Sequence, residues 1–189
     1  GDVIDSQDMK PFSTQFTFTR FLVPFLTGRH GWAIFMDCDM MIREDIYKLW
    51  DLRDDKYAVM CVKHQHVPDD GRKMFNQVQT RYSRKNWSSV MMINCGHERH
   101  RDLSLGDVNT RSGSWLHNFS WCNGEAEKYI GEIPEAWNWL DGHSSSDIDP
   151  SNVHMTRGGP WIPEWQEVAF ADEWRVYFDE IEQADREWI

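Results

Sequence analysis

The sequence predicts an α/β fold in which helices flank a mostly parallel sheet. Residues 32–36, 57–62 and 89–93 form short runs that are almost entirely apolar. Such runs are typical of strands buried on both faces, as in parallel sheets. Segments with helical spacing of apolar residues separate and follow these runs, and strands that alternate with helices indicate an α/β fold. The 189 residues have the length of one domain.

The helices are predicted from caps and periodicity. Ser13 and Thr14 are N-cap candidates for a buried helix that is bent or ended near Pro24 and closed by Gly28. A short helix is expected around residues 46–50. At the C-terminus, one helical face is expected to carry Trp174, Phe178, Ile181, Ala184 and Trp188.

Polar segments rich in Ser, Asp and Gly are predicted to be loops, at residues 102–114 and 141–151. His97 and His100 have helical spacing in a polar context, and we expect both to be solvated.

Composition excludes some classes of partner. The chain has 20 Lys+Arg against 31 Asp+Glu, a net charge of −11, which argues against nucleic acid and anionic membranes as partners. No run approaches the ~20 apolar residues of a membrane span. The four cysteines form no CxxC pair, which favours reduced thiols and a cytoplasmic location.

Two carboxylates, Asp37 and Asp39, directly follow the first apolar run. Ligands bind beyond the carboxyl ends of strands in open α/β sheets, and carboxylates at i and i+2 can both approach one Mg²⁺ or Mn²⁺ ion. The alternative is that both residues cap the next turn. A strand followed by DxD also occurs in phosphatases of the haloacid dehalogenase type, but Met41 stands where those enzymes carry Thr or Val.

Five ordered blocks carry further motifs, from about residue 13 to residue 178. They are 13–24, the strand 32–39, 63–64 with 77–80 and 84–89, 133–140, and His154 with Gly158-Gly159-Pro160-Trp161. Together they resemble bacterial and phage glycosyltransferases related to glycosyltransferase family 8.

The resemblance implies a GT-A fold in a single catalytic domain, residues 1–189. It also implies transfer of a sugar from a nucleotide-diphosphate donor, expected to be a UDP-sugar, to an acceptor hydroxyl with retention of configuration. Asp37, Asp39 and His154 would hold Mn²⁺, or Mg²⁺. The expected donor-binding residues are Arg20, Asp37, Asp39, Ser88, Ser89, Gly158 and Gly159. The expected substrate-binding residues are His64, Gln77, Trp137, Asn138 and Trp161.

Three departures from the family pattern matter. Only 36 residues precede the DxD, so we expect the N-terminal nucleoside-binding portion to be missing. The usual run of aspartates facing the sugar is absent, which leaves the catalytic residue open, with Glu125 and Glu127 as candidates. Gly159 stands where a Lys is usual, and Arg157 is the alternative cation.

A second class of function stays open beside the enzyme. The 11 tryptophans could form stacking platforms for sugar rings in a non-catalytic glycan-binding or interaction module.

Overall fold

The computed structural model describes residues 17–65, 72–73, 77–78, 84–122 and 124–187. Its described strands form a four-stranded sheet in the order β1-β6-β3-β7, a three-stranded sheet in the order β2-β9-β8, and the two-stranded ribbon β4-β5. Their bounds are β1 Trp32–Met36, β2 Met40–Ile42, β3 Val59–Cys61, β4 Arg72–Lys73, β5 Gln77–Val78, β6 Val90–Asn94, β7 Ile130–Glu132, β8 Trp139–Leu140 and β9 Asn152–His154.

The α/β class is confirmed, but the expected mostly parallel pairing is wrong for the described strands. β6 runs antiparallel to both β1 and β3, and β2 runs antiparallel to β9. Only β3–β7 and β8–β9 are parallel pairs among the strands described. An apolar run reports burial on both faces of a strand, and it carries no information on the direction of its neighbours.

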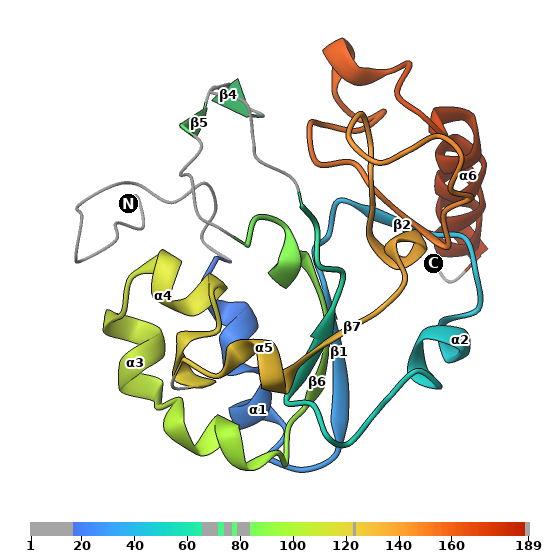
Figure 1. Ribbon diagram of the computed structural model, residues 1–189. Helices are drawn as coiled ribbons and strands as arrows, with labels where there is room; N and C mark the ends of the chain where they lie inside the picture. The colour runs from blue at the N-terminus through green and yellow to red at the C-terminus, as the bar shows by residue number, and fades with distance from the viewer. Residues whose placement is uncertain (1–16, 66–71, 74–76, 79–83, 123, 188–189) are drawn as a thin grey trace.

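Short helical segments connect these strands. The α-helices are α1 Val23–Leu26, α2 Ile46–Trp50, α3 Leu105–Thr110, α4 Gly113–His117, α5 Ala126–Tyr129 and α6 Ala171–Glu187. The 3₁₀ turns are η1 Thr19–Leu22, η3 Trp87–Ser89, η4 Glu98–Asp102, η5 Ser120–Cys122, η6 Glu135–Asn138 and η7 Pro163–Trp165. In Figure 1, α1, α3, α4 and α5 gather on one side of the main sheet, and α6 lies beside the second sheet.

The predicted loop at 102–114 instead contains α3 and the start of α4. Ser104 accepts a hydrogen bond from the Asp107 N–H, and the Asp107 carboxylate accepts one in return, a capping box. Ser112 caps α4 through the Trp115 N–H. The serines and the aspartate that indicated a loop are therefore helix caps. The predicted loop at 141–151 contains no helix or strand.

The main sheet is packed on both faces through β6. Met91 and Ile93 face a core formed with the helices, whereas Val90 and Met92 face a second core that contains Leu49. This alternation explains the uninterrupted apolar run of β6. A third cluster lies under the second sheet.

The two terminal helices differ in part from their predictions. The segment does not end at Pro24, where η1 passes directly into α1, and Gly28, with φ +64°, closes it as expected. The N-cap candidates Ser13 and Thr14 lie outside the described residues. α6 forms where predicted, with Trp174 packed on the third cluster. Phe178 and Ile181 are 44% and 62% exposed, so the described part of the chain covers only part of the predicted apolar face.

All four cysteines are free, and Cys61, Cys95 and Cys122 are buried, which agrees with the expected reduced thiols. Burial raises the pKa of the Cys61 thiol to about 12, so it is unreactive at neutral pH. Among the described residues, no helix is long and apolar enough to cross a membrane.

Candidate metal and donor site

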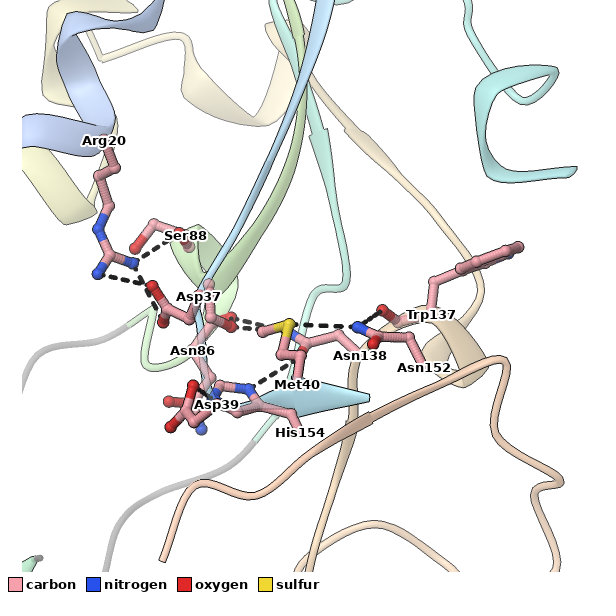
Figure 2. Close-up of polar contacts among 11 residues, drawn as sticks. Arg20, Asp37, Asp39, Met40, Asn86, Ser88, Trp137, Asn138, Asn152 and His154 are labelled. Atoms are coloured by element: carbon pink, nitrogen blue, oxygen red, sulfur yellow. Dashed lines mark hydrogen bonds and ion pairs between the residues drawn. The ribbon is translucent and has the colours of Figure 1, made fainter. Parts of the chain in front are cut away.

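Three predicted metal ligands lie together at the junction of the two sheets. Asp37 and Asp39 stand between the end of β1 and the start of β2, and His154 ends β9. The β2–β9 ladder places Met40 opposite His154, and the Met155 N–H donates to the Asp39 carbonyl oxygen at 2.9 Å. The strand register therefore brings a histidine from late in the chain to the aspartate pair, as Figure 2 shows.

The geometry of this trio suits one small cation. One ligand atom from each of Asp37, Asp39 and His154 lies within 4.8 Å of the others. The His154 Nε2 is 3.3 Å from an Asp39 carboxylate oxygen, and the Asp39 side chain is 22% exposed. Two carboxylates and one imidazole match the ligand preferences of Mn²⁺, and Mg²⁺ accepts the carboxylates.

Arg20 reaches this site from η1. Its guanidinium lies 2.9 Å from an Asp37 carboxylate oxygen and also donates to the Ser88 carbonyl at 2.8 Å. Burial raises the pKa of Asp37, while Arg20 and His154 act in the opposite direction. Arg20 is thus the ion-pair partner of Asp37 at the edge of the core, and its contact with the donor stays a prediction.

Asn138 contacts His154 on the side away from the aspartates. The His154 Nδ1 is 3.0 Å from the Asn138 Oδ1. The Asn138 Nδ2 donates to the Ser89 Oγ at 2.9 Å and to the Asn86 carbonyl at 3.1 Å. Asn138 and Ser89 were expected at the site, and the structure places both in the surroundings of His154.

His117 is a member of the site that the sequence did not indicate. Its Nδ1 lies 2.6 Å from the Ser88 Oγ, and both residues are buried. Burial, with the nearby Arg20 and Lys85, lowers the pKa of His117 well below its usual value, so its ring is neutral at pH 7. The residues around His117 in the sequence do not indicate its contact with Ser88, which is 29 residues away.

Trp137 packs into the protein core. It is 5% exposed and belongs to the second core, so its ring serves packing here, and its substrate contact stays a prediction. Trp161 is 45% exposed, and its ring centroid lies 5.5 Å from that of Trp174. Its substrate role stays a prediction.

The glycine pair serves tryptophan packing. A Cβ at Gly158 would lie 2.4 Å from the Trp165 ring, and one at Gly159 would lie 2.1 Å from the Trp161 ring. The Gly158 N–H donates to the Met155 carbonyl. It is therefore already bonded within the protein, whereas we expected it to contact a phosphate. The role of Gly159 stays a prediction. Arg157, the alternative cation, donates to the buried Asp141 carboxylate at 2.7 Å.

The two catalytic candidates are held in ion pairs. Glu125 pairs with Arg99 at 3.0 Å, near Tyr129. The Tyr129 carbonyl accepts from the Ala58 N–H at the start of β3, which is the end of the sheet opposite the aspartates. The structure therefore does not bring Glu125 to the metal-ligand trio.

Glu127 pairs with Arg84 and, at 3.7 Å, with Lys63. Both cations also lie over the Trp87 ring, at 5.0 and 5.7 Å from its centroid. This arrangement gives Glu127 a role in holding the segment before η3, and its catalytic role stays a prediction.

Two predicted substrate residues remain. His64 is buried and its carbonyl accepts from the Trp87 Nε1 at 2.9 Å. Gln77 lies in β5, paired with Lys73. Substrate contacts of both residues stay predictions.

Comparison with known sequences finds a plant relative. The Arabidopsis thaliana protein named Protein CDI is 47% identical over 180 residues, which cover 93% of this chain and 67% of that protein. No family model matches the chain. This relative gives no support to the bacterial or phage origin in the resemblance.

Comparison with solved structures identifies the fold as that of GT-A glycosyltransferases. The bifunctional glycosyltransferase WbbM in its apo form has a TM-score of 0.59 at 16% identity, over 85% of this chain and 35% of that one. Galactosyltransferase LgtC, solved with donor and acceptor sugar analogues, has a TM-score of 0.51 at 12% identity, over 83% of this chain and 66% of LgtC. GlyE of Streptococcus pneumoniae has a TM-score of 0.53 at 14% identity, over 93% of this chain and 44% of GlyE. The chain therefore spans about a third of the length of the first of these structures.

Proposed function

We propose, starting from the fact that this chain belongs to the family of Protein CDI of Arabidopsis thaliana, that it is a metal-dependent glycosyltransferase. It would move a sugar from a nucleotide-diphosphate donor, a UDP-sugar, to an acceptor hydroxyl with retention of configuration. The proposal includes a relationship to glycosyltransferase family 8 and a single catalytic domain in residues 1–189.

The observation that carries this proposal is the trio of Asp37, Asp39 and His154. A pair of aspartates near a turn is commonly structural, and the sequence alone leaves that alternative open. Here a histidine from a second sheet places its Nε2 3.3 Å from one of these carboxylates. Three ligand atoms within 4.8 Å of one another are close enough for a single divalent ion to bind all three.

The residues around the trio have distinct parts in the proposal. Asp37, Asp39 and His154 hold Mn²⁺ or Mg²⁺, which when bound supplies Lewis acidity for the diphosphate leaving group. Arg20 orients the Asp37 carboxylate and adds positive charge at the site where the diphosphate binds. Ser88 is held by His117 and Arg20 directly beside Asp37.

Thermal unfolding tests the proposal. We expect UDP-glucose or UDP-galactose to raise the Tm of the wild-type protein in the presence of Mn²⁺, well beyond Mn²⁺ alone. Asp39→Ala removes one ligand and should abolish this shift. Asp55→Ala is the matched control, because Asp55 is exposed at the other end of β1, bonded to the Trp32 indole.

Other outcomes would support the competing functions. Release of phosphate from a generic monoester, without binding of a UDP-sugar, would favour the phosphatase. Binding of glycans that depends on neither Mn²⁺ nor nucleotide would favour the binding module.

A further inference from the structure

We propose that Asn138 is a positioning residue that keeps a proton on the Nδ1 of His154, so that Nε2 faces Asp37 and Asp39. Ser89 and Asn86 hold the Asn138 amide in the one orientation that can do this. The proposal rests on the proposed function only for the metal, since the protonation of the ring is a property of the protein alone.

The orientation of the Asn138 amide follows from its two acceptors. The Asn86 carbonyl, 3.1 Å away, has no hydrogen to give. The Ser89 hydroxyl donates its single hydrogen to that same carbonyl at 2.7 Å, so at 2.9 Å from Asn138 its oxygen must accept. Both contacts therefore require the NH₂ group of Asn138 on this side, and a flipped amide would leave two oxygens facing oxygens.

The protonation of His154 follows from the orientation of the amide. The atom of Asn138 that faces the His154 Nδ1, at 3.0 Å, is then the carbonyl oxygen, which only accepts. The Nδ1 must carry the hydrogen of this bond. In the neutral ring, the lone pair is left on Nε2, which lies 3.3 Å from an Asp39 carboxylate oxygen and within the trio.

Burial makes this network a strict constraint. Asn138 is 0% exposed, Ser89 3% and His154 4%, so water cannot replace a lost partner without cost. Asn86 adopts φ +64°, a left-handed conformation that asparagine tolerates better than most residues. The network also joins three separate segments of the chain, η3, η6 and β9, around one imidazole (Figure 2).

The network gives Ser89 a different role from the predicted donor contact. Its hydroxyl uses its hydrogen on Asn86 and accepts from Asn138, and both bonds point into the protein. Outer-shell partners of a metal-binding histidine fix its tautomer and orientation, and their loss typically weakens metal binding by about 10- to 100-fold.

The first test is ¹⁵N NMR of the histidine side chains in the metal-free protein, with the His154 signals assigned by their absence in His154→Gln. We expect the Nδ1 of His154 to show the shift of a protonated nitrogen. In Asn138→Ala, the described polar side chains that face the ring are the carboxylates on the Nε2 side, so the proton should move to Nε2 and leave Nδ1 bare.

Asn152→Ala is the matched control. Asn152 is an equally buried amide on β9 that bonds to the Trp137 carbonyl and the Met40 sulfur.

The second test is calorimetric titration with Mn²⁺. Asn138→Ala should bind Mn²⁺ about 10- to 100-fold more weakly than wild type, whereas Asn152→Ala should stay close to wild type. A bare Nδ1 in the wild-type protein overturns the proposal, and this measurement needs no variant to fold. Unchanged ring protonation in a folded Asn138→Ala, or equal Mn²⁺ affinities of wild type and Asn138→Ala, also overturns it. If the wild-type protein binds no Mn²⁺, the proposed function fails, and the NMR result still decides the protonation.

Discussion

Two histidines of this chain are buried to nearly the same degree but have opposite surroundings. His100 is 1% exposed and His154 is 4% exposed. His100 contacts the Ala58 carbonyl through Nε2, and its Nδ1 has no hydrogen-bond partner among the described residues. Both nitrogens of His154 face polar groups, Asn138 on one side and Asp39 on the other.

The difference shows that burial alone does not separate a structural histidine from a ligand. Burial lowers the pKa of His100 to about 4, which keeps its ring neutral and suited to the core. His154 has a fixed partner on one nitrogen and two carboxylates on the other side, the arrangement that a metal-binding imidazole needs. The second nitrogen and its partner are what distinguish the two.

The largest expected effect concerns acid stability and His100. Between about pH 6.5 and about pH 4 the unfolded chain takes up a proton at this position that the folded protein excludes. Stability therefore falls as the pH falls through this range, by up to about 3 kcal/mol for a shift of this size. Urea unfolding across the range should show this loss in wild type and a shallower pH dependence in His100→Gln. Parallel curves for the two proteins would show that His100 is not held neutral.

The next effect concerns metal affinity and compares the same substitution at the two sites. His154→Gln should weaken Mn²⁺ binding by about 100-fold, or about 2.7 kcal/mol, because it removes a ligand rather than an outer-shell partner. His100→Gln should bind Mn²⁺ as wild type does. Equilibrium dialysis with Mn²⁺ measures both, and equal losses in the two variants would erase the distinction between these histidines.

A smaller effect is expected for the ion pairs next to each histidine. Arg20→Met leaves the half-buried Asp37 without its guanidinium and should lower the free energy of unfolding by about 2 kcal/mol. Glu125→Gln breaks an exposed pair with Arg99, the residue before His100, and should change stability within the error of urea unfolding. A larger loss of stability for Glu125→Gln than for Arg20→Met would contradict the claim that the Arg20–Asp37 pair contributes more to folding than the Arg99–Glu125 pair.

Apolar runs and their bounding residues predicted the strands whose limits they determine. The strand 32–36 was predicted with the bounds that β1 has, because an apolar run there is bounded by Gly31 and Asp37. α3 and α4 were missed because their serine caps have the composition of a loop. The antiparallel course of β6 depends on chain connections that an apolar run does not encode.

Only part of the site was predicted, because its residues come from segments that are far apart in the sequence. The trio came from a resemblance across the whole chain, and the β2–β9 register explains how its members meet. The burial of His100, expected to be solvated, depends on contacts with Trp121 and Ala58 that its neighbours in sequence do not reveal. The bonds from Asn138 to Ser89 and Asn86 span 49 and 52 residues, beyond any local pattern.

The most direct measurement of the central claim is pulsed EPR of Mn²⁺ bound to the protein with UDP. If Asp37, Asp39 and His154 hold the ion that receives the diphosphate, the spectrum will show coupling to one imidazole nitrogen and to phosphorus nuclei of the nucleotide. The nitrogen coupling will disappear in His154→Gln. A spectrum with phosphorus couplings and no imidazole nitrogen would contradict the claim, because it would describe Mn²⁺–UDP that His154 does not bind.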